Sequence, residues 1–146
     1  MALVYVDDLL LTGNHVPTIT HVKKALNDAF TIKDLGLMRY FLGLEVARSS
    51  SGTFLSQRKY ILDIIADTKM THCTPASFPL PRGLKLSIDD GSLLDEPESY
   101  RRLIGRLLYL NMIRPDVLYD VQHLSQFLQT PRMPHMRATL HVVRYL

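Results

Sequence analysis

An aspartate pair, Asp7-Asp8, interrupts the apolar residues at the start of this chain of 146 residues. Apolar runs flank the pair at residues 3–6 and 9–12, and both have the length of strands and lack the spacing of an amphipathic helix. Adjacent carboxylates repel each other and resist burial. The pattern therefore predicts two short buried strands joined by a tight turn that carries both aspartates.

Two carboxylates at the tip of a hairpin can have either of two roles, a structural role in the turn or a role in binding a metal ion. Aspartate is a common turn residue, because its side chain bonds to the nearby backbone. Carboxylate oxygens that converge on one spot also suit Mg²⁺, which keeps several waters and recruits substrate phosphates. Two such ions can activate an attacking hydroxyl group and stabilise a leaving pyrophosphate. A second pair, Asp89-Asp90, lies in a proline-rich stretch and is interpreted as a solvated turn.

Apolar spacing predicts the next helix. Ile19, Val22 and Leu26 recur at helical spacing, which predicts a helix over 18–29 with Thr18 as its N-cap.

A β-hairpin and a second helix are expected to follow. Residues 40–47 form a predicted strand with Leu42, Leu44 and Val46 on one face, and residues 53–57 return as its partner after a turn. A helix is predicted over 58–68. Its inward-facing residues are Ile61, Leu62 and Ile65.

The regular spacing of apolar residues ends at residues 71–97, which contain four prolines, Pro75, Pro79, Pro81 and Pro97. Proline lacks a backbone donor and disrupts regular helix, so this segment is predicted to be a long connection. Beyond it, apolar spacing predicts helices over 98–112, from 114–116 to about 128, and over about 135–146.

Composition excludes several classes of protein. The single cysteine, Cys73, excludes internal disulfides and a cysteine-rich zinc module. Arg106 interrupts the apolar stretch at 103–113, so no membrane span is expected. The first residues lack the basic region of a signal peptide, which predicts an intracellular protein. A net charge of +3 permits a polyanionic partner without requiring one.

Tyr5-Val6-Asp7-Asp8 resembles the Tyr-x-Asp-Asp motif of reverse transcriptases, and the run L-V-Y-V-D-D-L-L-L-T-G is similar to its form in copia-type LTR retrotransposons. The resemblance continues in order along nearly the whole chain. Its further blocks are F-T-I-K-D-L-G (30–36), Y-F-L-G-L-E-V (40–46), F-L-S-Q-R-K-Y (54–60), Y-R-R-L-I-G-R-L-L-Y-L (100–110), R-P-D (114–116), L-S-Q-F (124–127) and R-Y-L (144–146). One departure is Lys69, where the family pattern often has glycine before the methionine.

The resemblance implies an α+β fold in three parts. Residues 1–70 would form part of a polymerase palm, with the catalytic β-hairpin, a helix and a hairpin similar to a primer grip. Residues 71–97 would be the proline-rich connection, and residues 98–146 a helical segment similar to a polymerase thumb.

The resemblance also implies roles for residues of the predicted palm. Asp7 and Asp8 would be the catalytic carboxylates that bind Mg²⁺, with Tyr5 and Val6 near the incoming nucleotide. Lys33 would assist the leaving pyrophosphate, although a solvated lysine fits the same position. The hairpin predicted over 40–57 would position the primer, through Tyr40, Phe41, Leu42 and Gly43. Ordinary sheet packing accounts for the apolar residues of that hairpin equally well.

The implied partners are an RNA–DNA template–primer and deoxynucleoside triphosphates. A thumb holds a duplex through phosphate contacts from basic residues. Arg102 and Arg106 on one predicted helix, and Arg137 and Arg144 on another, are the candidates, and each pair also fits a solvated helix face.

A polymerase site of this type needs a third carboxylate on an earlier strand, and none of the six residues before Asp7 is acidic. The fingers, the first half of the palm and the ribonuclease H domain are also expected to lie outside this sequence. The chain alone is therefore expected to lack polymerase activity. Two alternatives stay open, a non-catalytic remnant that binds nucleic acid and an inert helical interaction module.

Overall fold

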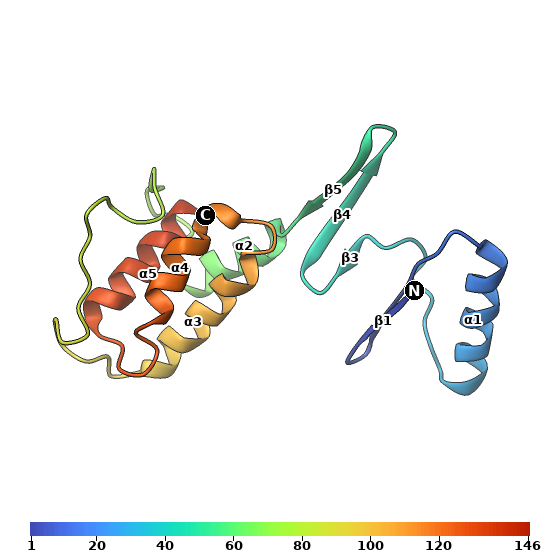
Figure 1. The fold of residues 1–146 in the computed structure, drawn as a ribbon, viewed down its shortest axis with the longest axis horizontal. Coiled ribbons are helices and arrows are strands. Elements are labelled where there is room, and N and C mark those ends of the chain that lie inside the picture. Colours follow the sequence, from blue (N-terminus) through green and yellow to red (C-terminus); the bar gives the residue numbers. More distant parts are fainter. The chain divides into compact units, whose positions relative to one another are not determined.

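A strand-rich unit, Met1–Ser56, and a helical unit, Gln57–Leu146, make up the chain in a computed structural model that describes residues 1–146 (Figure 1). The five strands lie in the first unit, and four of the five α-helices lie in the second. This mixture confirms the α+β class predicted from the sequence. None of the helices has the length and apolar character needed to cross a membrane.

The chain begins with the predicted hairpin, in which β1 (Ala2–Tyr5) pairs with β2 (Asp8–Leu11) in antiparallel register. Tyr5 lies opposite Asp8, so the connecting turn consists of Val6 and Asp7. Asp7 therefore lies in the turn, as predicted, whereas Asp8 is the first residue of the returning strand.

The apolar residues of this hairpin are exposed, although the sequence predicts buried strands. Leu3 is 47% exposed and Val4 68%, and neither strand has a fully buried residue. The sheet has only these two strands, which are too few to bury a face by themselves. The prediction of strands is confirmed, and the prediction of their burial is wrong.

Helix α1 (Val16–Ala29) starts two residues before the predicted position. Its N-cap is His15, whose Nδ1 accepts a hydrogen bond from the backbone N–H of Thr18. Thr18 as the N-cap is therefore wrong. Pro17 fits inside the first turn, where a missing N–H leaves no bond unmade, so the helix can begin ahead of it.

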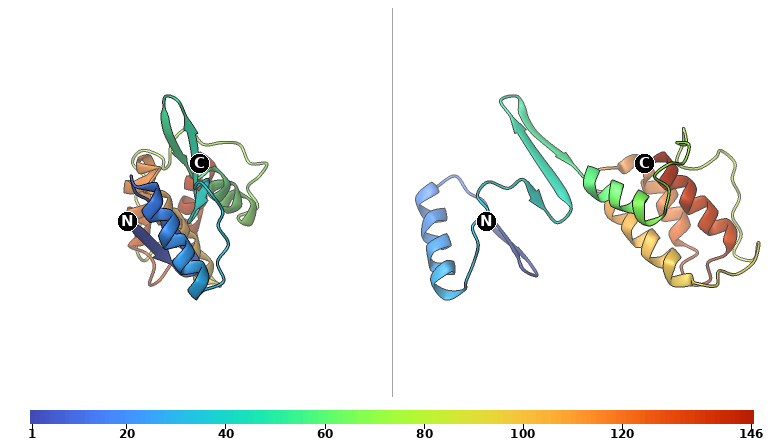
Figure 2. Two further views of the ribbon diagram at one scale, coloured as in Figure 1. Left: turned by 90° about the vertical axis from the view of Figure 1, so that its right-hand side faces the viewer. Right: turned by 180° about the vertical axis from the view of Figure 1, so that it is seen from behind.

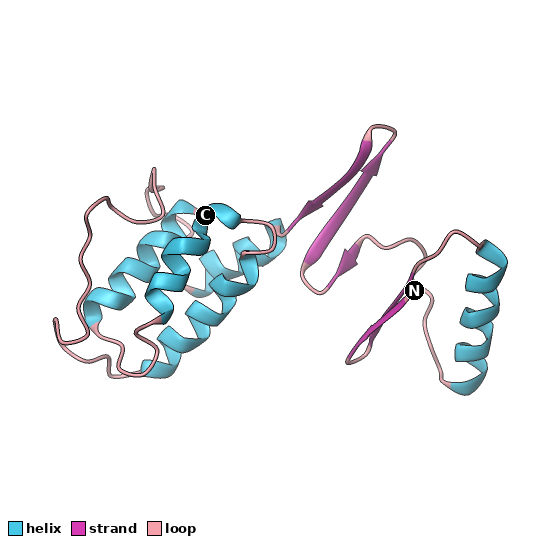
Figure 3. Cartoon of the chain, viewed as in Figure 1, coloured by secondary structure: helices cyan, strands magenta, loops and turns pink.

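The predicted single strand over 40–47 is wrong, because it is divided into β3 (Tyr40–Phe41) and β4 (Leu44–Ser49). Leu42 and Gly43 form the turn between them, with φ angles of 48° and 75°. Positive φ at both central residues is typical of the two-residue turns that join antiparallel strands. Leu42 consequently does not share a strand face with Leu44 and Val46. The partner strand β5 (Gly52–Ser56) lies within one residue of its prediction, and the sheet order is β3-β4-β5 (Figure 3).

The helical unit contains the predicted helices in the predicted order. They are α2 (Arg58–Asp67), α3 (Pro97–Leu110), α4 (Leu118–Ser125) after a 3-10 turn at Pro115–Val117, and α5 (Met133–Tyr145). On α2 the buried residue is Ile64, and Ile61 and Ile65 are partly buried beside it. Leu62 is 49% exposed, so its inward placement is wrong. A step of one residue from Ile61 turns a side chain about 100° around the helix.

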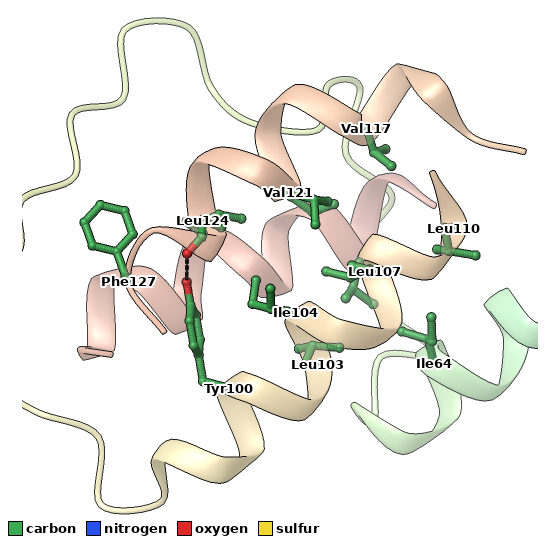
Figure 4. Packing of buried hydrophobic residues seen from close by; sticks show 13 residues of the cluster. Ile64, Tyr100, Leu103, Ile104, Leu107, Leu110, Val117, Val121, Leu124 and Phe127 are labelled. Atoms are coloured by element: carbon green, nitrogen blue, oxygen red, sulfur yellow. Dashed lines mark hydrogen bonds between the residues drawn. The ribbon is translucent and has the colours of Figure 1, made fainter. Parts of the chain in front are cut away.

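The core lies between α3, α4 and α5, with Ile64 of α2 against it (Figure 4). Figure 4 shows Ile104 and Leu107 of α3 beside Val121 of α4, and these side chains are fully buried. Tyr100 is also buried, and its hydroxyl donates a hydrogen bond to the Leu124 carbonyl at 2.7 Å. Burial raises the pKa of Tyr100 to about 12, which keeps this hydroxyl a donor.

The segment between α2 and α3 has no helix or strand of its own, and α5 holds much of it in place (Figure 2). Side chains of α5 and its N-cap bond to backbone carbonyls of this segment. Arg132 donates from Nε to Ile88 and from Nη1 to Gly91, both at 2.7 Å. Near the other end of α5, Arg144 donates from Nε to the Thr74 carbonyl at 2.9 Å.

Helix α2 ends in a motif that normally uses glycine. The N–H of Met70 bonds to the Ile65 carbonyl and the N–H of Lys69 to the Ala66 carbonyl, both at 2.9 Å. This pattern places Lys69 at the left-handed position of a helix C-terminus, and its φ angle is 58°.

Replacing Lys69 by glycine is expected to raise the free energy of unfolding by about 1 kcal/mol, because glycine adopts positive φ without a steric penalty. Urea unfolding followed by far-UV circular dichroism measures the change. Lys69→Ala is the matched control, since it removes the same side chain and keeps the unfavourable φ. An equal gain from both variants would show that the side chain, and not the backbone, is responsible.

His135 is a fully buried histidine whose two ring nitrogens are both bonded. Nδ1 accepts from the Arg132 N–H at 3.0 Å, and Nε2 lies 3.0 Å from the Ser87 carbonyl. Because a carbonyl only accepts, Nε2 carries the proton and the ring is neutral. The ring also stacks on Phe127, with centroids 3.9 Å apart. Burial lowers the pKa of His135, and the charge of Arg132 acts in the same direction.

The free energy of unfolding is therefore expected to fall as the pH drops through about 6.5, where the histidine of the unfolded chain takes up a proton that the folded chain resists. Urea midpoints between about pH 7.5 and pH 5.5 measure this loss. His135→Gln has no titrating ring, so its midpoint should change less over the same interval. A wild-type midpoint that rises on acidification would contradict the expectation.

Candidate active site

The two candidate catalytic aspartates are consecutive residues at the end of the first hairpin. Asp7 is in the turn and Asp8 begins β2, and both residues are exposed. Neither carboxylate has an ion pair or hydrogen bond within the chain. Both are therefore free to bind a cation from solvent.

The backbone of this turn is strained at Val6, whose φ angle is 49°. A β-branched residue rarely adopts positive φ, and such a conformation costs on the order of 1–3 kcal/mol. Strained residues of this kind cluster at functional sites, where the backbone is held in one productive geometry. The Val6 side chain is 82% exposed at the tip, directly before the two aspartates.

The donor set of the hairpin fits part of a magnesium site. Mg²⁺ is usually bound through one or two carboxylates, with waters and substrate phosphates as its other ligands. Asp7 and Asp8 supply two carboxylates of this kind, and no group of three or more metal-binding side chains exists in the chain. The hairpin therefore offers a pair of ligands, and a complete protein cage is not present.

Lys33 is exposed in the loop after α1, where no side chain pairs with it. Its neighbour Asp34 accepts hydrogen bonds from Lys23 at 2.8 Å and from the Gly36 N–H at 2.9 Å. The bond from Lys23 lowers the pKa of Asp34. The F-T-I-K-D-L-G block thus ties the loop to α1 through Asp34, a residue that sequence reasoning missed. The Asp-x-Gly spacing, which is typical of a side-chain turn, is the signal that could have identified it.

The candidate primer-positioning residues surround the turn between β3 and β4. Leu42 and Gly43 form the turn, Tyr40 is 53% exposed and Phe41 is buried. A backbone bond from the Val46 N–H to the Arg39 carbonyl, at 2.8 Å, holds the start of this hairpin. The sheet that contains it is separate from the two-stranded sheet of Asp8, so the structure does not join the two candidate regions into one sheet.

The four candidate arginines of the helical unit fall into two kinds. Arg106 pairs with Asp67 at 2.5 Å and lies over the Tyr60 ring, and Arg144 bonds to the Thr74 carbonyl. These two side chains therefore connect segments of the unit. Arg102 and Arg137 are exposed and have no partner within the chain.

Two of the short sequence blocks meet in the helical unit. Arg114 donates to both carboxylate oxygens of Asp116, at 2.7 and 2.9 Å, and lies over the ring of Tyr145 at 5.5 Å. The bond from Arg114 lowers the pKa of Asp116. R-P-D and R-Y-L are therefore packed against each other, and this role was not visible in either block alone.

Comparisons with known proteins identify the family of the chain. A family model described as reverse transcriptase (RNA-dependent DNA polymerase) matches residues 1–82. The chain is 44% identical over 145 residues to the retrovirus-related Pol polyprotein from transposon RE1 of Arabidopsis thaliana, covering 99% of the chain and 10% of that protein. It is 34% identical over 155 residues to the corresponding polyprotein from transposon TNT 1-94 of Nicotiana tabacum, covering 99% of the chain and 12% of that protein.

A shorter relative, a putative transposon Ty5-1 protein of Saccharomyces cerevisiae, is 34% identical over 145 residues, which cover 98% of the chain and 47% of the relative. The chain thus spans about a tenth of the length of the Arabidopsis polyproteins that it matches. No solved structure matches it.

Proposed function

Because the chain belongs to the reverse transcriptase (RNA-dependent DNA polymerase) family, we propose that it is the part of a retrotransposon Pol polyprotein that contributes two catalytic carboxylates to RNA-directed DNA synthesis. The observation that carries the proposal is the hairpin of β1 and β2, which has Asp7 in its turn and Asp8 at the start of the returning strand, both exposed and without a partner.

In this proposal Asp7 and Asp8 hold divalent cations, of which Mg²⁺ best suits carboxylate oxygens. Mg²⁺ supplies Lewis-acid chemistry there, in support of the attacking 3′-hydroxyl of the primer and the leaving pyrophosphate. Tyr5 and Val6 flank the carboxylates on the side of the incoming deoxynucleoside triphosphate. Lys33 approaches the phosphates from the loop after α1.

The residues around the second hairpin align the primer. Tyr40 and Phe41, with the Leu42-Gly43 turn, hold its 3′ end, because phosphoryl transfer depends mainly on alignment and electrostatic stabilisation. Residues 1–70 are then part of a palm, residues 71–97 a connection, and residues 98–146 a thumb-like segment. Arg102 and Arg137, which have no partner in the chain, are the arginines best placed to contact phosphates of the template–primer.

The exposed apolar residues of the strand-rich unit support a role within a larger protein. Phe30 is 66% exposed, Leu35 79%, Leu37 80% and Phe54 69%. Helix α1 has no buried residue. Apolar surface on this scale is usually covered by other protein, and further parts of the polyprotein, including the strand that bears the third carboxylate, are the proposed cover.

A chimera tests the proposal. The chain replaces the matching segment of the RE1 polyprotein, and RNA-templated extension of a DNA primer is measured in Mg²⁺, with the unmodified polyprotein as the reference. We expect the chimera to extend the primer and the chain alone to be inactive. Extension by the chain alone, or a folded chimera that binds template–primer normally without extending it, would contradict the proposal.

A further inference from the structure

We propose that the free edge of β5 pairs with the β5 strand of a second copy of the chain, so that two three-stranded sheets join into one sheet of six strands. Strand β5 is the last strand of the sheet β3-β4-β5 and has no strand on its outer side. Its first four residues are exposed. The pairing involves neither Asp7 nor Asp8, so it does not depend on the catalytic role of the first hairpin.

Two residues of β5 direct their backbone groups to this free edge. The Val46 N–H bonds to the Arg39 carbonyl at 2.8 Å, on the side of β4 that faces β3. Bonded and non-bonded pairs alternate along an antiparallel ladder, so Leu55, which lies opposite Val46, directs its N–H and C=O away from β4. Thr53 lies two residues earlier and faces the same way. The outward groups of both residues have no partner within the chain.

The edge of β5 has none of the features that normally prevent strands from pairing. Proteins protect free edges with lysine, proline, bulges or very short strands. Strand β5 has the sequence G-T-F-L-S, without charge or proline, and its register with β4 is continuous over five residue pairs. The opposite edge of the sheet differs, because β3 has only two residues and the Arg48 side chain bonds to the Met38 carbonyl just before it. Association is therefore expected through β5, and it stops at two copies because each β5 has one free edge.

A second copy of β5 suits this edge better than an unrelated strand, because the edge is complementary to itself. Two antiparallel copies centred on Phe54 place Thr53 of each copy opposite the partner's Leu55. The outward groups of these residues then form four backbone hydrogen bonds across the two-fold axis. Since β5 contains no charged residue, no like charges face each other in this register.

The central residue of the register adds an aromatic pair. Phe54 is 69% exposed, and its neighbour across β4 is the small Ala47. In the dimer Phe54 lies opposite its own copy in a non-hydrogen-bonded pair, where Cα atoms are about 4.5 Å apart and side chains meet most closely. Aromatic pairs across neighbouring strands stabilise a sheet. The protein that covers Phe54 is then a second copy of the polyprotein.

Five residue pairs along one edge form a small interface, and complexes of small area bind weakly. The dissociation constant of the dimer is expected to be on the order of 100 µM. Sedimentation equilibrium of the whole chain, from about 5 to about 500 µM, tests this expectation. The chain should be mostly monomeric at the lower concentration and mostly dimeric at the higher one. A monomer throughout, or growth beyond a dimer, would overturn the proposal.

A proline in the free edge separates strand pairing from other routes to association. Thr53→Pro removes an N–H that takes no part in the ladder with β4, and proline is tolerated in edge strands for this reason. We expect this variant to stay monomeric over the whole range. Thr53→Ala is the matched control, because it removes the same side chain and keeps the N–H. Its dissociation constant should stay within about three-fold of that of the parent. Association of Thr53→Pro as strong as that of Thr53→Ala would overturn the proposal, since another surface would be responsible.

Far-UV circular dichroism checks the fold of each variant. If Thr53→Pro unfolds the hairpin, Phe54→Lys keeps every backbone N–H and places two like charges opposite each other across the two-fold axis. We expect it to weaken dimerisation about ten-fold or more, because it also removes the aromatic pair. Phe78→Lys is its matched control, since Phe78 is a phenylalanine of the helical unit and is 58% exposed. It should leave the dimer unchanged, and equal losses from the two lysine variants would contradict a dimer built on β5.

Disulfide formation tests the register in a Cys73→Ser background, which lacks the native thiol. Phe54→Cys brings two cysteines together with Cα atoms about 4.5 Å apart, within the range that a disulfide spans. Thr53→Cys leaves the two cysteines offset by two residues and about 8 Å apart, which is beyond that range. Under oxidation by diamide, Phe54→Cys should form linked dimers several-fold faster than Thr53→Cys. Equal rates would rule out the register centred on Phe54 and with it the proposed pairing.

Discussion

We expect Asp7→Asn to reduce RNA-templated primer extension by the chimeric polymerase by roughly 10³-fold, an increase of about 4 kcal/mol in the activation barrier. The substitution keeps the size of the side chain and removes the negative charge that is proposed to hold a divalent cation. Asp7 lies in the turn itself, between the strained Val6 and Asp8, the first residue of β2, so the variant hairpin keeps one carboxylate where the parent has two.

The rate of single-nucleotide incorporation at saturating deoxynucleoside triphosphate measures this effect. Asp90→Asn is the matched control, because it changes the other aspartate pair, which lies in the proline-rich segment of the helical unit. It should leave the rate unchanged. A rate for Asp7→Asn that stays within about ten-fold of the parent would be incompatible with a metal-binding role for this carboxylate.

We expect Leu107→Ala to lower the free energy of unfolding of the helical unit by about 2–5 kcal/mol. The Leu107 side chain is fully buried in the cluster shown in Figure 4, between α3 and the helices that pack on it. Its truncation removes apolar contacts and leaves a cavity that the neighbouring helices fill only in part. Small domains are stable by about 5–15 kcal/mol, so this loss is a large part of the total.

Urea unfolding followed at 222 nm, with its midpoint and slope, measures the loss for Leu107→Ala. The next residue of the same helix is also leucine, and Leu108 is 37% exposed. Leu108→Ala is therefore the matched control, and its cost should stay below about 1 kcal/mol. Equal costs for the two variants would mean that α3 does not present the face on which the core depends.

The sequence predicts the elements of this fold well, because most of them depend on local patterns. The helices follow from apolar residues at helical spacing, and the first hairpin from the aspartates between two apolar runs. The prediction of one continuous strand over 40–47 was wrong, because a regular alternation of apolar residues does not reveal that Leu42 adopts positive φ. The prediction that the first hairpin is buried was wrong. Burial depends on what packs against a sheet, and the local spacing of apolar residues contains no such information.

The candidate site shows the same limit. The Tyr-x-Asp-Asp motif is local, and its position at the end of a hairpin could be predicted from the sequence. The roles of Arg106 and Arg144 depend on Asp67 and Thr74, which are 39 and 70 residues away along the chain. The ring of His135 bonds to Ser87, 48 residues away. Such contacts between distant segments have no signature in the spacing of residues.

Helix α1 has no buried side chain, whereas α3 has five. Local opening of the strand-rich unit therefore requires far less free energy than opening of the helical core. Brief digestion with a small amount of protease would consequently trim residues 1–56 first and leave a resistant piece that starts near Gln57. We therefore expect the segment that carries the two aspartates to need contacts with other protein for its stability, and the helical unit to need them less.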